Sequence, residues 1–304
     1  MESTLLGLLA PTLWAACAGL IVWQCLGLTR EITYVEIGDG RRQARSLPLA
    51  FKMLLPFAPN LKRFFLSPSF ARRREEIDRR IVAAGFEGLL TGWEFLALQV
   101  LNPIAMGLIW CIAIHLIGML DETVSAYFWP LSLLGIVLFA IQPSLWLKQT
   151  IRARQKSIQR AMPFMIDLLT LSVEAGIDFM SAIQRATSGR KMDPLNEELI
   201  RVSHEIRLGT TRQKALRNLA ARVDMPDMRS FCFALIQADE LGVGIGSILR
   251  IQSDQMRQKR FDRAERLANE APVKMLFPLM LFIFPAVFIV LLGPILSRIG
   301  GNLL

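Results

Sequence analysis

Histidine is scarce in this chain of 304 residues, which contains only His115 and His204. His204 precedes Glu205, as at the start of a zinc-protease helix, but that motif needs a second histidine where the sequence has Leu208. The sequence therefore excludes this metal site. His115 lies in a long uncharged run, where a histidine can mark a polar pathway or form a hydrogen bond between helices, and both alternatives stay open.

Cysteine is also sparse, with four residues, and no pair of them has the spacing of metal ligands. We expect them to be reduced and to pack as small apolar side chains. Residues 14–17 (Trp-Ala-Ala-Cys) faintly resemble a lipoprotein cleavage box. A signal sequence carries positive charge before its apolar run, whereas this chain has Glu2 there, so we expect the first apolar run to be a retained anchor.

Motifs of nucleotide binding and nucleophilic catalysis are lacking. Residues 242–247 read Gly-Val-Gly-Ile-Gly-Ser, but a Walker A loop needs a lysine and the dinucleotide pattern needs glycine in place of Ser247. Glycine's permissive dihedral angles suit the same residues to a turn between helices. There is no nucleophile elbow. The sequence therefore predicts a protein that is not an enzyme and has no cofactor.

Formal charge is missing from four stretches of 23 to 27 residues. A bilayer core of about 30 Å needs about 20 helical residues, so each stretch can span a membrane with some tilt. One such run could be the buried helix of a soluble protein, but four in one chain indicate a membrane protein. The predicted transmembrane helices are residues 1–29, 93–120, 123–147 and 274–297.

Basic residues are confined to the segments between these runs. Of the 35 lysines and arginines, 34 lie within residues 30–92 or 148–274. This is the positive-inside pattern, which predicts that both segments are cytoplasmic, in a bacterial inner membrane, and that both termini are periplasmic. Anionic lipids are expected partners of such segments, and they explain the charge without nucleic acid.

Five residues at the ends of these runs fit the membrane interfaces. Arg30 and Lys274 are the charges beside the first and fourth runs. Trp93 and Trp146 flank the second and third runs on the predicted cytoplasmic side, and Trp129 lies at the outer edge of the third. Indole rings favour this mixed environment, so we expect these residues to mark the membrane boundaries.

The first basic segment, residues 30–92, mixes prolines with basic clusters. Its apolar stretches 47–57 and 61–70 suit chain lying on a membrane surface. Residues 72–84 predict a charged helix, and Gly85 is a plausible stop because glycine is favoured just past a helix end.

The second basic segment, residues 148–273, repeats apolar residues every three to four positions, which predicts amphipathic helices. Asp178 is an expected helix cap, and Pro194 fits the first turn of another helix. No stretch alternates with period two for long enough to suggest a sheet, and about 125 residues suffice for a core. The predicted fold class is an all-α integral membrane protein with four transmembrane helices and a cytoplasmic helical bundle.

Short motifs follow one another through the second basic segment and the last apolar run. They are Met162-Pro163, 167–169, 173–177, Ala182-Ile183, Gly209, Ala215-Leu216, 238–242, 271–278 and 291–294. In this order, and with this membrane layout, they resemble the type II secretion F domain. The closing stretch, together with residues 84–86 and 94–96, resembles the TadC branch of the tight-adherence (Tad/Flp) pilus. The resemblance covers about residues 70–297.

The resemblance implies a six-helix cytoplasmic bundle and a platform role without catalysis. Such platforms sit above a hexameric secretion ATPase and pass its movement to pilin subunits that leave the membrane. Type II secretion platforms carry two F domains, whereas this chain has one convincing copy. The expected partners are therefore the hexameric ATPase, pilin subunits, and either a second copy of the chain or a TadB-like platform protein.

Two acidic residues stand beside glycines of the family pattern. Glu174 lies near Gly176, and Glu240 lies near Gly242. The two carboxylates either contact the ATPase or a neighbouring bundle, or pair within their own bundle while the glycines end helices. Gly209, in the turn after another predicted helix, belongs to the same set of candidate interaction residues.

A small transporter or channel is the alternative function. Such proteins carry ionisable residues or broken helices around a substrate in the membrane. The four runs contain few polar groups and lack the charged residues that transporters use. Pro278, Pro285 and Pro294 could nevertheless kink the fourth run.

Overall fold

A computed structural model describes residues 30–37, 41–119, 127–189 and 192–301. The predicted first transmembrane helix, residues 1–29, lies outside the described residues. In the part that the structure describes, three helices are long and apolar enough to cross a membrane. They include α5 (Gly92–Gly118), α7 (Phe128–Glu174) and the helical run from Ile245 to Leu292, so the predicted all-α membrane fold is confirmed.

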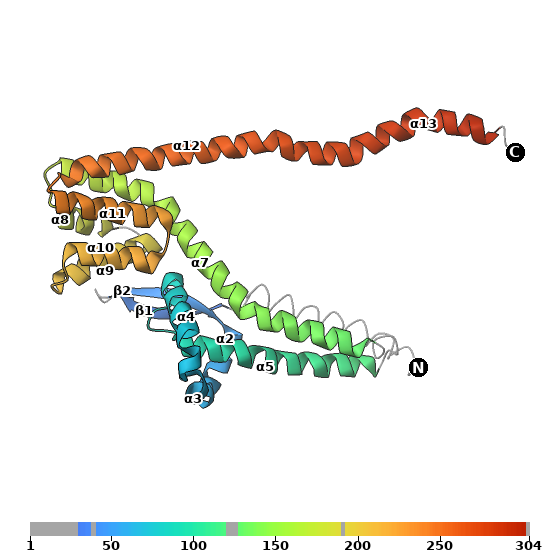
Figure 1. The fold of residues 1–304 in the computed structure, drawn as a ribbon, viewed down its shortest axis with the longest axis horizontal. Coiled ribbons are helices and arrows are strands. Elements are labelled where there is room, and N and C mark those ends of the chain that lie inside the picture. Colours follow the sequence, from blue (N-terminus) through green and yellow to red (C-terminus); the bar gives the residue numbers. More distant parts are fainter. Residues whose placement is uncertain (1–29, 38–40, 120–126, 190–191, 302–304) are drawn as a thin grey trace.

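Helices α5 and α7 pair along their apolar lengths (Figure 1). The buried amide of Asn102 on α5 donates from Nδ2 to the carbonyl of Phe139 and to Oε1 of Gln142, each across 2.8 Å. Gly135 on α7 leaves room for the ring of Trp110, because a Cβ there would lie 2.1 Å from two ring atoms. Small residues and buried polar groups of this kind hold helices together in a membrane.

Helix α7 continues from its apolar part into a helical bundle without a break (Figure 1). Pro143 and Pro163 both lie inside it. A proline removes one helical hydrogen bond, but Met162, Met165 and Ile166 around the second proline are buried in the bundle core. Their burial keeps the helix running to Glu174.

Six helices enclose the bundle core. They are the second half of α7, then α8 (Phe179–Thr187), α9 (Pro194–Arg207), α10 (Arg212–Val223), α11 (Pro226–Leu241) and the start of α12 (Ile245–Pro278). The predicted cap at Asp178 is confirmed, since its side chain accepts a hydrogen bond from the backbone N–H of Met180. Pro194 begins α9 as predicted, and Asp193 caps that helix by accepting from the N–H of Asn196.

The segment before α5 contains a β-hairpin that the sequence prediction missed. Strands β1 (Arg30–Ile37) and β2 (Arg41–Pro48) form a two-stranded antiparallel sheet, with Arg30 paired to Pro48 and Ile37 to Arg41. The expectation of no sheet is therefore wrong at this place. The first strand is rich in β-branched residues, which favour strands, and its eight residues are too few to give a long alternating pattern.

Short helices follow the hairpin and pack at the start of α5. They are α2 (Leu49–Leu54), η1 (Leu55–Leu61), α3 (Lys62–Phe65), η2 (Pro68–Phe70) and α4 (Ala71–Ala84). Phe51 and Phe65 are buried against Phe95 and its neighbours in a second core, whereas Met53, Phe57 and Phe64 are exposed. This mixture suits chain that is half embedded in a membrane surface.

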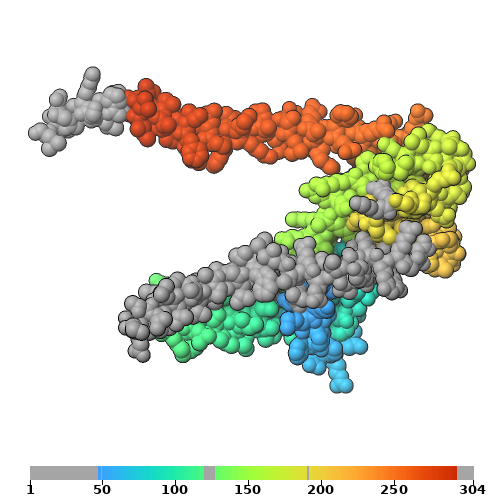
Figure 2. Space-filling model, turned by 180° about the vertical axis from the view of Figure 1, so that it is seen from behind, coloured from blue at the N-terminus to red at the C-terminus, as the bar shows by residue number. Residues whose placement is uncertain are grey.

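Helix α12 leaves the bundle and runs into η3 (a π-helical turn, Leu279–Ile283) and α13 (Phe284–Gly301). Every residue from Arg257 to Leu292 is exposed. Figure 2 shows this arm standing apart from the α5–α7 pair, and in Figure 1 both arms extend from the bundle toward the same side. Spans that cross one membrane from one bundle require this arrangement.

Candidate partner-binding face

The structure brings the five candidate interaction residues to one end of the bundle. Helices α7, α9 and α11 end there, and α8, α10 and α12 begin there (Figure 1). Gly176, Gly209 and Gly242 lie in the three turns that join them. This end points away from the apolar arms (Figure 1).

Each of the three turns depends on a glycine with positive φ. The angles are 84° at Gly176, 94° at Gly209 and 66° at Gly242. In each turn the next N–H bonds back to the carbonyl five residues earlier, as from Thr210 to Glu205 across 3.0 Å. This is the Schellman pattern that closes helix C-termini. The glycines therefore act as helix stops.

The two candidate carboxylates form exposed ion pairs between helices. An oxygen of Glu174 lies 3.5 Å from Arg250 on α12, and an oxygen of Glu240 lies 3.4 Å from Arg217 on α10. Exposed pairs contribute little to stability. Both carboxylates are thus paired within the bundle and also accessible to a partner.

Apolar side chains are exposed beside these charges. Leu208 is 74% exposed, Leu241 is 76% exposed and Val243 is 44% exposed. Each stands next to a turn glycine. We call the three glycine turns, these apolar residues and the Glu174 and Glu240 pairs the distal face. An exposed apolar group rimmed by charge is typical of a protein interaction site.

An ion cluster inside the bundle escaped the sequence analysis. Arg154 on α7 contacts Glu197 at 3.0 Å and Glu198 at 2.7 Å, and all three side chains are buried. Arg222 on α10 also contacts Glu198, at 2.9 Å, and pairs with Glu205. Burial favours a raised pKa for Glu198, but the charges of Arg222 and Arg154 outweigh it and hold that pKa below its usual value.

The cluster extends to the segment before α5. Arg201 on α9 pairs with Glu87, which follows α4. Burial favours a lowered pKa for Arg201, but Glu198 and Glu87 outweigh it and raise that pKa. The ion pairs of the cluster therefore join α7, α9 and α10 to the membrane-proximal segment.

The predicted interface residues have different surroundings. Trp146 packs edge-on to Phe51, with ring centres 5.1 Å apart, and Lys62 lies 5.7 Å above the ring of Trp93. Trp129 is exposed at the far end of α7, and Lys274 pairs with Glu270 on the exposed arm. Arg30 is the first residue of β1. The two inner tryptophans thus also support the second core.

The residues considered as possible catalytic or binding groups can now be placed in the structure. Ser247 donates from its hydroxyl to the carbonyl of Gly244 across 2.7 Å, within the first turn of α12. Burial raises the pKa of Cys232 to about 12. His115 is exposed on α5, and its ring centre lies 6.2 Å from that of Phe128. Within the described residues no group of three His, Cys, Asp or Glu side chains could hold a metal ion.

These features define an all-α integral membrane protein with a helical bundle. Residues 165–293 match the family model of the type II secretion system (T2SS), protein F. The chain therefore contains a T2SS F domain. This domain indicates that the chain is a platform protein of a type II secretion or type IV pilus system. A search of curated proteins and a search of solved structures gave no significant match.

Proposed function

We propose that this chain is the inner-membrane platform protein of a Tad/Flp pilus. In this role it couples a cytoplasmic secretion ATPase to the extraction and polymerisation of pilin. The observation that carries the proposal is the distal face, which gathers three turns, exposed leucines and paired carboxylates at the end of the F domain farthest from the apolar arms. A cytoplasmic motor would reach this end first.

The orientation of the chain is part of the proposal. Nearly all lysines and arginines lie in residues 30–92 and 148–274, which supports a cytoplasmic bundle and periplasmic termini. The apolar arms would then cross the inner membrane toward the site where pilin subunits leave it. The chain itself would catalyse no reaction and bind no cofactor.

Coupling would run through the two helices that connect the distal face to the membrane. The end of α7 meets the start of α12 at the Glu174–Arg250 pair, and a Cβ on Gly246 would lie 3.5 Å from Val173. A partner that shifts this junction moves two membrane arms together. Such a shift requires the bundle to have two arrangements of similar energy.

A second F-domain protein would complete the platform. No described residue covers the apolar part of the Ile245–Leu292 run, which is fully exposed. In a membrane, helices associate through close packing with other helices. The exposed arm therefore favours assembly with a TadB-like partner or with a second copy of this chain.

The test is site-specific photo-crosslinking in cells that assemble the pilus, with the crosslinker placed at Leu208 or Leu241. We expect a crosslink to the hexameric ATPase from both sites. Gln149, which is exposed on α7 near the membrane, is the matched control and should give none. Equal ATPase crosslinking from Gln149 would contradict the proposed docking face.

Gentle solubilisation gives an independent check. The chain should co-purify with the ATPase and with a second F-domain protein, and recovery of neither would contradict the platform role. Ion or solute flux through the purified chain alone in vesicles would instead support the transporter alternative.

A further inference from the structure

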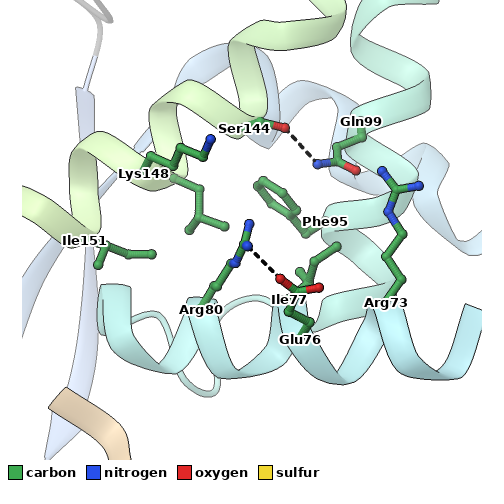
Figure 3. Close-up of a pocket in the computed structure, with 10 residues that line it drawn as sticks. Arg73, Glu76, Ile77, Arg80, Phe95, Gln99, Ser144, Lys148 and Ile151 are labelled. Carbon is green, nitrogen blue, oxygen red and sulfur yellow. Dashed lines mark hydrogen bonds and ion pairs between the residues drawn. The ribbon is translucent and has the colours of Figure 1, made fainter. Parts of the chain in front are cut away.

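A small cavity lies where α4 crosses the α5–α7 pair (Figure 3). Its volume is about 120 Å³. The floor is apolar and includes Ile77, Phe95 and Leu147, and Gln99 donates to the hydroxyl of Ser144 across 3.1 Å at one side. Three helices thus line the cavity, which has an apolar floor and polar side chains around it.

Three cations surround the cavity. Arg73 and Arg80 come from α4 and Lys148 comes from α7, and Glu76 is the only carboxylate in the lining. Arg73, Ile77 and Arg80 are spaced as neighbours along one face of a helix. Glu76 pairs with Arg80 at 2.6 Å, so the lining keeps a positive excess that suits an anion.

The cavity lies where the charged and uncharged parts of the chain meet. Leu147 is the last residue of one uncharged run and Lys148 is the first charge after it, while Phe95 is the first residue of another uncharged run. All three line the cavity. The boundary between charged and uncharged chain is where the hydrocarbon core of a bilayer ends.

An apolar track leads from the cavity along α7. Ile141 and Val137 lie three and seven residues before Ser144, on the same face of the helix. They are 47% and 46% exposed. Pockets that enclose a whole small molecule measure about 300–1,000 Å³, so this cavity has room for the phosphate of a ligand whose remaining part lies outside, along such a track.

We propose that the cavity binds the phosphate headgroup of an anionic phospholipid, with Arg73, Arg80 and Lys148 around the phosphate and the acyl chains along α7. Basic pockets between helices on the cytoplasmic side of a membrane have this function. A bound lipid would join α4, α5 and α7 at the base of the bundle. The lipid site would be present whether or not the chain serves a pilus machine.

The test uses the full chain in detergent, with lipid binding measured by native mass spectrometry. The probes are phosphatidylglycerol and the zwitterionic phosphatidylcholine. We expect the wild-type chain to prefer phosphatidylglycerol. The triple variant Arg73→Gln, Arg80→Gln, Lys148→Gln should bind it roughly 100-fold more weakly, at about fivefold for each cation.

The matched control removes three cations outside the cavity lining, from the same two helices, as Arg72→Gln, Arg79→Gln, Arg152→Gln. It should bind phosphatidylglycerol like the wild type. The variant Ser144→Phe fills the cavity and keeps every charge, and it should lose the lipid as well. Thermal unfolding without added lipid checks that each variant is folded.

Two outcomes would overturn the proposal. Equal loss of lipid in both triple variants, with normal binding by Ser144→Phe, would mean that diffuse surface charge attracts the lipid. Displacement of phosphatidylglycerol by millimolar inorganic phosphate, dependent on Arg73, Arg80 and Lys148, would mean that the cavity is a site for a soluble anion.

Discussion

Arg154 on α7 donates to Glu198 on α9 across 2.7 Å, and the two side chains are only 5% and 4% exposed. Arg154 stands between the apolar part of α7 and the residues that α7 gives to the bundle core. The contact therefore fixes the bundle to the helix that enters the membrane. A buried charge without a partner is costly, which makes this contact sensitive to substitution.

Arg154→Gln should lower the free energy of unfolding of the bundle by about 3–5 kcal/mol, because Glu197 and Glu198 would lose their shared cation in a buried site. Chemical denaturation of the full chain in mild detergent measures the change. Arg79→Gln is the control, because Arg79 pairs with Glu75 on the exposed surface of α4. A loss no greater than that of the control would contradict the structural role of the cluster.

The ion cluster should also make the bundle sensitive to acid. The pKa of Glu198 is lowered in the folded chain from an ordinary value of 4.5. The unfolded chain therefore takes up the proton first, and the stabilisation is full above about pH 4.5 and is lost as the pH falls through the folded pKa. Melting temperatures between pH 7 and pH 3 should fall less steeply in Glu198→Gln than in the wild type.

The melting temperature of Glu198→Gln should still fall as the pH is lowered, although less than that of the wild type. Burial favours a raised pKa for Asp227, but hydrogen bonds from Lys259 and Gln159 outweigh it and lower that pKa too. Identical slopes in wild type and variant would show that Glu198 takes no part in the acid response.

Gly135→Ala should loosen the α5–α7 pair. The new methyl group would overlap the ring of Trp110, which donates to the carbonyl of Leu131 across 3.1 Å. Overpacking of this kind costs about 1–3 kcal/mol, measured as thermal stability in detergent. The double variant with Trp110→Leu should recover part of the loss. If the two losses simply add, the close contact is not the cause.

Gly209→Ala and Gly242→Ala should each destabilise the bundle by about 1–2 kcal/mol, because a left-handed conformation is unfavourable for residues with a Cβ. Gly244→Ala is the control in the same part of the fold. Its φ is −57° and no atom lies within 4 Å of the added Cβ. Urea titration should show a loss in the first two variants only, and an equal loss at Gly244 would contradict the dihedral explanation.

Local signals in the sequence were enough to predict much of the fold. Asp178, Asp193 and Thr211 each accept a hydrogen bond from a backbone N–H in the first turn of a helix. These contacts span two or three residues, so they depend on nearby sequence alone. The apolar runs are local signals too, because a continuous stretch of sequence long enough to span a bilayer can be recognised without knowing any distant contact.

The ion cluster could not be predicted in this way. Arg154 is 44 residues from Glu198 in sequence, and nothing in the periodicity of either helix selects one partner among many charges. The same limit holds for the cavity at α4, whose cations meet only after three helices pack. The distal face was partly predictable, because glycines at helix ends are local signals, but its exposed leucines resembled ordinary core positions.

Helix α7 extends without a joint for 47 residues, which is about 70 Å at 1.5 Å per residue. From Leu147 to Glu174 it measures about 40 Å. In the proposed platform, this helix would act as a lever arm with its fulcrum at the membrane surface. A tilt of about 10° there displaces the outer end by about 7 Å, more than one helical turn of about 5.4 Å.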